Sequence, residues 1–301
     1  MRALRDYSPL EWVRAAPLAH GARRGRNILV DRIYRRFRVP GQDEVQRALA
    51  AHRGGTLAFT VAFNLPEAVA LLSQAMARFL PGTPLVVCDN SNQPEARARI
   101  AAVCAERGHI YCPLPPAPLG RFSSNGSRSH AVALNWIYHN LIRPTEPKVF
   151  ALLDHDLVPL AIDDFADRVA SQPAYGMVRH GARFGCWFLW PGYSVFDYAA
   201  TAEMDLDFGT DTPLTLDTGG QNWHRLYRRM RLGDMRQAQT REVYLGDGAG
   251  GREPYLLADT WMHVGGAGHR GGGAAALARV RQAFEADPQG LLARLLENAA
   301  G

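Results

Sequence analysis

The stretch VFALLDHDLVPL, residues 149–160, runs from an apolar segment into two aspartates and then turns apolar again. Asp154 and Asp156 stand one residue apart, at the expected end of a buried strand. Side chains at positions i and i+2 of a strand point to the same face. The pair could therefore hold one divalent cation, or a cation and a ribose. A DxD pair alone is common by chance, so its surroundings decide its meaning.

Upstream of this stretch, apolar strand-like segments alternate with helical ones. The expected strands cover 56–64, 84–90 and 109–115, and the expected helices cover 65–80, 93–108 and 131–142. Such alternation predicts an α/β fold, a Rossmann-type, mostly parallel sheet flanked by helices. Right-handed crossovers place all strand ends at one edge, where ligands of such sheets bind. Asn64, Asp89 and the aspartate pair lie at or just past the ends of three expected strands, namely 56–64, 84–90 and the one that begins at 149, so we expect them to converge on one crevice.

Beyond residue 170 the alternation fades. Residues 175–180 and 186–196 predict strands with little helix between them, which indicates a small antiparallel addition in the second half. Pro191 and Gly192 predict a turn inside the second of these segments. Residues 218–232 are a helix candidate, with Asp217 near its start.

Composition indicates a soluble globular protein. The 301 residues are 47% hydrophobic and 21% charged, with a net charge of +5. The four cysteines show no metal spacing and are expected to be reduced thiols. The first ten residues hold no signal-peptide core, and no apolar run is long enough for a transmembrane helix. We therefore expect a cytoplasmic protein.

Arginines concentrate in RRGRNILVDRIYRRFR, residues 23–38. We interpret this segment as part of a solvated, partly helical extension. A basic cluster can also bind nucleic acid or an anionic membrane surface. The chain has no zinc-finger spacing, RNP motif or helix-turn-helix signature, so we expect no nucleic-acid partner. Peripheral membrane contact through this basic segment stays open.

A third metal ligand is suggested by ADTWMHVGGAGHR, residues 258–270. His263 ends an apolar segment and precedes glycines that let the backbone approach an anion closely. An imidazole with two carboxylates is a reasonable Mn²⁺ ligand set. The alternative is a histidine that is merely hydrogen-bonded at a strand end.

The order of these residues resembles the nucleotide-sugar-dependent glycosyltransferases of the GT-A fold, in particular family 2-like members with a DxD motif. The likeness is carried by FTVAFNLPEAV (59–69), LVVCDNSN (85–92) and FALLDHDLVP (150–159), and WMHVGGAG (261–268) extends it. It covers roughly residues 56 to 160.

The resemblance implies a nucleoside diphosphate sugar as donor, with a UDP-sugar favoured, and Mn²⁺ or Mg²⁺ as cofactor. Asp156 and His263 would bind the metal, and Asp154 would share the metal or the ribose. His269 and Arg270 would close over the diphosphate. The other residues implied at the donor site are Ala62, Phe63, Asn64, Asp89, Arg128, Ser129, His130 and Asn135.

The chain departs from the family pattern in two places. Asp89 is followed by Asn90 where family members often have a second aspartate, and no Glu-Asp pair stands where a catalytic base is expected. Asp217 could deprotonate an acceptor hydroxyl, or it could simply cap a helix. Trp190 and Tyr193 could stack on an acceptor sugar, although such aromatic residues are more often buried in a core.

Three further functions compare with this one as follows. Nucleotidyl transfer would predict a glycine-rich loop and a lysine after the first strand, where the chain reads AFNLPEA. An aspartic protease needs two paired carboxylates, and Asp217-Thr218-Gly219 has no counterpart. A non-catalytic nucleotide-sugar-binding protein stays open.

We expect three parts along the chain. A basic extension over 1–55 would precede or pack on a catalytic domain over 56–275. That domain would divide into a nucleotide-binding half, 56–160, and an acceptor half, 161–275. A helical tail over 276–301 would follow, with Leu277, Val280 and Phe284 on one face.

Overall fold

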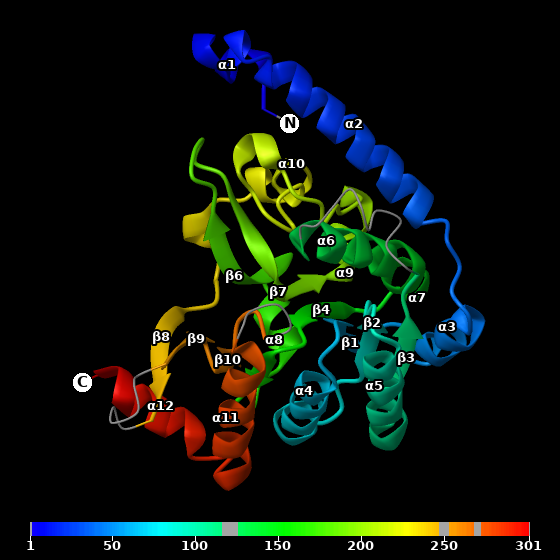
Figure 1. Ribbon diagram of the computed structural model, residues 1–301, viewed down its shortest axis with the longest axis vertical. Helices are drawn as coiled ribbons and strands as arrows, with labels where there is room; N and C mark the ends of the chain where they lie inside the picture. Colours follow the sequence, from blue (N-terminus) through cyan, green and yellow to red (C-terminus); the bar gives the residue numbers. More distant parts are fainter. Residues whose placement is uncertain (1, 116–125, 247–252, 268–271, 301) are drawn as a thin grey trace.

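The computed structural model describes residues 2–115, 126–246, 253–267 and 272–300, and this part of the chain forms two sheets (Figure 1). The larger sheet has the strand order β3-β2-β1-β4-β7-β6 and the smaller one the order β5-β10-β9-β8. The strands of the larger sheet are β1 (Thr56–Ala62), β2 (Leu85–Asp89), β3 (Ile110–Pro113), β4 (Val149–Asp154), β6 (Ala174–His180) and β7 (Trp187–Asp197). Those of the smaller sheet are β5 (Leu157–Pro159), β8 (Thr240–Leu245), β9 (Glu253–Ala258) and β10 (Trp261–His263).

The larger sheet is mostly parallel, as predicted. β1 pairs in parallel with β2 and β4, and β2 pairs in parallel with β3. β7 runs antiparallel to both β4 and β6. The strand order and the helices around it confirm the predicted α/β class and agree with the GT-A-like fold that the sequence resembles.

The antiparallel addition is also confirmed, and the structure divides it into two units. β6 and β7 extend the main sheet, whereas β5, β8, β9 and β10 form the separate antiparallel sheet. The predicted turn at Pro191 and Gly192 is wrong, because β7 continues through both residues. Its pairing with β6 passes from Leu189 opposite Val178 to Ser194 opposite Gly176, so the intervening residues bulge. Proline is tolerated at such a bulge because no ladder hydrogen bond is lost.

The helices between the parallel strands lie where the sequence predicts them. They are α4 (Pro66–Phe79), α5 (Pro94–Arg107) and α6 (Gly126–Ile137), which continues into a π-helical turn (Tyr138–Ile142) and α7 (Arg143–Thr145). Pro66 and Pro94 stand in the first turn, where a missing N–H costs nothing. Gly108 ends α5 in the left-handed conformation, with φ of 69°.

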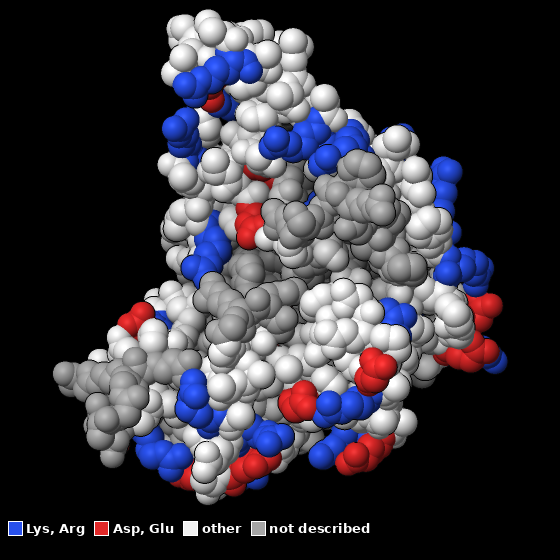
Figure 2. All heavy atoms as spheres, viewed as in Figure 1, with Lys and Arg blue, Asp and Glu red and all other residues white. Residues whose placement is uncertain are grey.

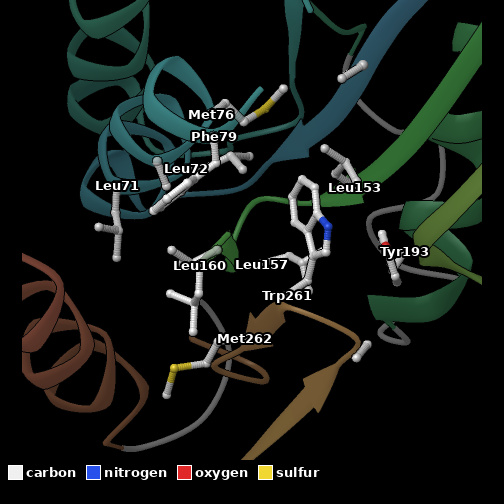
Figure 3. Close-up of a cluster of buried hydrophobic side chains, with 14 of the residues drawn as sticks. Leu71, Leu72, Met76, Phe79, Leu153, Leu157, Leu160, Tyr193, Trp261 and Met262 are labelled. Atoms are coloured by element: carbon white, nitrogen blue, oxygen red, sulfur yellow. The ribbon is translucent and has the colours of Figure 1, made fainter. Parts of the chain in front are cut away.

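Side chains on both faces of the larger sheet are buried. Successive residues of a strand point to opposite faces, so each strand contributes to two cores. Phe59 and Val61 of β1 belong to a core shared with α6 and the π-helical turn. Ala58 and Ala62 belong to a second core, shared with α4, α5 and the smaller sheet. Figure 3 shows part of this second core, where side chains of β5 and β10 meet those of α4.

Between β4 and β8 the α-helices of the described residues are all short. They are α8 (Phe165–Val169), α9 (Tyr198–Thr201) and α10 (Asn222–Arg225). The predicted helix over 218–232 is therefore wrong. Gly219 is in the left-handed conformation, with φ of 88°, and its N–H donates to the Phe208 carbonyl. The Asn222 side chain accepts from the Asp207 N–H, so contacts with this loop replace those of a continuous helix.

Two helices end the described chain, α11 (Gly273–Ala286) and α12 (Leu291–Ala300). Leu277, Val280 and Phe284 are buried, as predicted for one face of the tail. The Phe284 ring packs edge-on against Phe79 of α4, with ring centroids 6.3 Å apart.

Three helices precede β1, namely α1 (Pro9–Val13), α2 (Ala16–Tyr34) and α3 (Gln42–Ala50). Residues 9–34, comprising α1 and α2, are called the arm below. Figure 1 shows the arm as a rod along the upper edge of the molecule, with α1 projecting from it. α2 packs against α6, and the buried Arg128 guanidinium holds it there by pairing with Asp31 at 2.5 and 3.3 Å.

None of the helices in the described part of the chain combines the length and apolar character that crossing a bilayer requires.

Candidate metal centre at the sheet edge

Asp154, Asp156 and His263 meet beyond the carboxyl end of β4. One ligand atom from each lies within 4.8 Å of the other two. The His263 Nε2 atom is 3.3 Å from Asp156 Oδ1 and 3.8 Å from Asp154 Oδ2. The structure thus brings together the three residues that the sequence suggested as metal ligands.

The smaller sheet produces this meeting. Asp154 is the last residue of β4, and Asp156 directly precedes β5. β5 pairs antiparallel with β10, which sets His263 opposite Leu157. The Val264 N–H donates to the Asp156 carbonyl at 3.1 Å and extends that pairing by one residue. An imidazole more than a hundred residues away is thereby fixed beside the carboxylates.

The three side chains differ in exposure. Asp156 is 4% exposed, His263 15% and Asp154 23%. The Ala267 N–H also donates to Asp156 Oδ2 at 3.2 Å. Asp156 is therefore the most buried and most firmly held of the three side chains, and Asp154 has the most surface open to a bound molecule.

The carboxylates and the imidazole shift each other's proton affinity. Burial by itself would raise the pKa of Asp156, but the hydrogen bond and charge of His263 hold that pKa well below its usual range. Burial by itself would lower the pKa of His263, but its hydrogen bond to Asp156 and the two nearby carboxylates raise it. A protonated His263 can thus balance the carboxylates, and a divalent cation would replace its proton.

This donor set suits a divalent cation. Ligand atoms around an octahedral cation at about 2.1 Å lie roughly 3 to 4 Å apart, close to the separations seen here. Two carboxylates satisfy Mg²⁺ or Mn²⁺, and the imidazole favours Mn²⁺ over Mg²⁺. Three protein ligands would leave positions for oxygens of a bound molecule.

The start of α6 lies along the same edge. His130 Nε2 is 3.8 Å from Asp154 Oδ1. Ser129 Oγ accepts from the Asn90 side chain, just past the end of β2, at 3.0 Å. Both side chains are partly exposed. Ser129 and His130 therefore border the space between the ends of β2 and β4.

The end of β1 reaches the same space. Ala62 is buried, and its carbonyl accepts from the Asn90 N–H at 2.9 Å. The Phe63 N–H donates to His155 Nδ1 at 3.3 Å, which ties the end of β1 to the residue between the two aspartates. His155 is a positioning residue that sequence reasoning missed, although its place inside the DxD pair marks it.

Asn64 and Asp89 organise the loop after β2. Asn64 has φ of 51°, a conformation that asparagine tolerates better than most residues, and its Oδ1 accepts from the Asn92 N–H at 3.1 Å. Asp89 is fully buried, and its carboxylate accepts from the Ser91 N–H and the Tyr111 hydroxyl, both at 2.8 Å. Both residues lie at the predicted sheet edge, and their side chains are hydrogen-bonded to other residues of the protein.

Arg128 and Asn135 serve other parts of the fold. Arg128 pairs with Asp31 of the arm, as described above. Asn135 is buried; its side chain donates to Asp207 Oδ1 at 3.0 Å and accepts from the Phe208 N–H at 2.8 Å. Sequence alone could not show this, because both partners lie far along the chain. His269 and Arg270 lie outside the described residues.

Of the two aromatic candidates, Trp190 lies at the metal group. Its ring is 4.7 Å from that of His263, at 54°. Gly192 permits this, since a Cβ there would come within 2.1 Å of the Trp190 ring. Tyr193 is fully buried in the core seen in Figure 3, with its hydroxyl 3.3 Å from Asp163 Oδ2.

Asp217 is exposed and begins a turn rather than a long helix. Its carbonyl accepts from the Gly220 N–H at 2.8 Å. The next residue, Thr218, donates to the Ser127 carbonyl at the start of α6, at 2.9 Å. Gly219 lies against Leu189 and Pro191, the neighbours of Trp190. The turn is thus held between two segments that flank the metal group.

No protein-family model and no curated protein matches this chain. Among solved structures, the crystal structure of S. aureus TarS matches at 13% sequence identity, with a TM-score of 0.34. The match covers 51% of this chain and 30% of that chain. At this distance the match supports no inference about function, so the proposals below start from the sheet edge itself.

We predict that the chain binds Mn²⁺ at this group. Asp156→Asn, Asp154→Asn and His263→Gln should each weaken Mn²⁺ binding at least roughly tenfold, because each removes a ligand. Isothermal titration with MnCl₂ measures this. Asp217→Asn, which changes a carboxylate outside the group, is the matched control and should bind Mn²⁺ as the wild type does. Equal Mn²⁺ affinity in all four variants would mean that the cation binds elsewhere.

Proposed function

We propose that this protein is a metal-dependent glycosyltransferase, which moves a sugar from a nucleoside diphosphate sugar to an acceptor hydroxyl. One observation carries the proposal: two carboxylates and an imidazole lie within 4.8 Å of one another at the carboxyl edge of a mostly parallel sheet. Ligands of open α/β sheets bind at this edge. The resemblance of the strand-end motifs to GT-A glycosyltransferases points the same way.

The donor would lie across the ends of β1, β2 and β4. Its diphosphate would face Asp154, Asp156 and His263. A Mn²⁺ or Mg²⁺ ion held there would neutralise charge on the departing diphosphate. The nucleoside would extend toward Phe63 and Asn64, which are partly exposed at the end of β1.

Other predicted donor residues take narrower roles in this proposal. Ser129 and His130, which border the space beside Asp154, would contact the ribose or the diphosphate. Asp89 would shape the base pocket by fixing the loop at Ser91, since its own carboxylate is fully buried. We favour a UDP-sugar as donor, as the family resemblance implies.

His269 and Arg270 follow Ala267 by two and three positions. The Ala267 N–H donates a hydrogen bond to Asp156, so Ala267 itself lies at the metal group. We propose that they contact the diphosphate, where a guanidinium stabilises developing negative charge.

The transfer would proceed by displacement at C1 of the sugar. The acceptor oxygen forms a bond to C1, the bond from C1 to the diphosphate oxygen breaks, and the acceptor proton passes to Asp217. An exposed carboxylate can take such a proton, and the turn that follows Asp217 contacts the start of α6 and the neighbours of Trp190. Trp190, partly exposed and lying on His263, would offer its ring face to the acceptor or the donor sugar.

Nucleotide binding is expected to depend on metal. A panel of UDP, GDP, CDP, dTDP and ADP, each with Mn²⁺ and with EDTA, should show one diphosphate, expected to be UDP, that raises Tm only with Mn²⁺. At a hundred times its Kd a ligand adds about 2.7 kcal/mol of stability, which gives a clear shift. Asp156→Asn should abolish the shift.

The same panel separates the alternatives. Metal-insensitive binding of a nucleotide would favour a non-catalytic binding protein. Release of pyrophosphate from a nucleoside triphosphate and a sugar phosphate would favour nucleotidyl transfer. No shift with any nucleotide would contradict the proposal.

The role of Asp217 is tested by turnover. Asp217→Asn should lower kcat for release of UDP from the best UDP-sugar by about 10² to 10⁴, the range of general-base catalysis, with the UDP thermal shift unchanged. Asp234→Asn, at another exposed aspartate of the same half, is the control. An unchanged kcat in Asp217→Asn would leave Asp217 as a turn residue only.

A further inference from the structure

The exposed apolar side chains of this protein are concentrated at its N-terminal end. Among the described residues, eleven large apolar side chains are exposed, and nine of them lie between residues 4 and 37. Single exposed apolar residues are normal on a protein surface, but a contiguous group marks an interaction site. Val13 is 84% exposed and Leu18 74%.

The long helix α2 differs from an ordinary surface helix, because its exposed face carries apolar side chains. Its outer face repeats Leu18, Ala22, Gly25, Leu29 and Ile33, at spacings of four, three, four and four residues. These spacings place all five on one side of a helix. All five except the glycine are apolar, and none is buried.

The side of α2 that faces the body is mostly polar, with Pro17 and Tyr34 as its buried apolar residues. Asp31 pairs there with Arg128, and Arg128 also donates to the Asn27 carbonyl at 3.2 Å. The groove between α2 and the loop 207–213 is lined by charged groups of both signs, including Arg24 and Asp207. Packing on the body therefore explains Pro17 and Tyr34 but not the outer apolar stripe of α2.

The short helix α1 adds to the outer apolar surface. Leu10 is 58% exposed, and Trp12 48%. Trp12 is the most exposed tryptophan among the described residues. Tryptophan is the residue that favours the boundary between headgroups and acyl chains.

Positive charge accompanies this surface. Residues 1–38 hold ten arginines and three acidic residues, whereas the remaining chain holds 24 basic and 26 acidic residues. All three acidic residues, Asp6, Glu11 and Asp31, are paired with arginines. Arg26 and Arg32 are exposed on opposite sides of the apolar stripe. Figure 2 shows arginines along the arm with few acidic side chains beside them.

We propose that the arm binds the surface of an anionic lipid bilayer. The stripe formed by Leu18, Leu29 and Ile33, together with Trp12, would enter the boundary between headgroups and acyl chains, and the arginines would contact the lipid phosphates. A helix with an apolar face flanked by basic residues binds membranes in this way, and each basic residue adds electrostatic attraction. A second copy of the chain fits less well, because it would bring two arginine-rich faces together. The proposal does not depend on the sugar-transfer reaction.

The experiment measures binding of the full chain to vesicles. We expect sedimentation with vesicles of phosphatidylcholine and phosphatidylglycerol, at least tenfold weaker binding to pure phosphatidylcholine, and weakening by salt. Binding should shift the tryptophan emission to shorter wavelength. Trp12→Phe should remove most of that shift while the protein still sediments.

Matched variants test the surface itself. Leu18→Ser with Leu29→Ser should weaken binding to anionic vesicles at least tenfold, and Arg26→Gln with Arg32→Gln should weaken it severalfold. Ile162→Ser changes a side chain that is 83% exposed outside the arm, so binding should be unchanged. All changes are at exposed positions, and unchanged Tm shows that the variants fold.

Three outcomes would overturn the proposal. The first is no binding to anionic vesicles, and the second is wild-type binding by the Leu18→Ser, Leu29→Ser variant. The third is a dimer in analytical ultracentrifugation that this variant abolishes, without vesicle binding, because the stripe would then be covered by a second copy.

Discussion

The site depends on a three-residue pairing between β5 and β10. This pairing sets His263 beside Asp156, and without it the aspartates would end a strand with no third ligand. Three ladder positions contribute little by themselves. The apolar core of Figure 3 stabilises this pairing. Leu157 of β5 and Met262 of β10 belong to the same buried cluster as side chains of α4. Fully burying such a side chain contributes about 1.5 to 3 kcal/mol, so the apolar core fixes the polar site.

Trp261 is central to that core. It is fully buried, stacks on Phe165 with ring centroids 5.7 Å apart, and its indole N–H donates to Asp163 at 2.8 Å. Its own strand, β10, ends at His263 two residues later. A packed indole therefore positions a polar imidazole, and β7 adds Trp190 against that imidazole where Gly192 leaves room.

Much of the fold and part of the site could be predicted from sequence, because the signals are local. Apolar strands, first-turn prolines and Gly108 mark the alternation as far as β4. The position of Asp154 and Asp156 at the sheet edge can be predicted from the end of a single strand. The sequence indicates His263 less directly, because its meeting with Asp156 depends on a pairing across more than a hundred residues.

The errors share one physical cause, namely contacts made at long range. Residues 218–232 have a helical composition, but Asn222 and Gly219 bond to the 207–208 loop instead. Pro191 and Gly192 read as a turn, but a bulge between β6 and β7 absorbs them. Apart from these two errors, the partners of Arg128 and Asn135 and the outward apolar face of α2 also appear only when the chain is folded, and the donor-site roles of both residues stay predictions.

The most direct test is a crystal structure of the protein with Mn²⁺ and UDP, with the manganese located by anomalous scattering. We expect an anomalous peak bounded by Asp156 and His263, close to Asp154, with diphosphate oxygens completing its coordination. A peak elsewhere, or UDP bound away from the ends of β1 and β4 with no metal at this group, would contradict it.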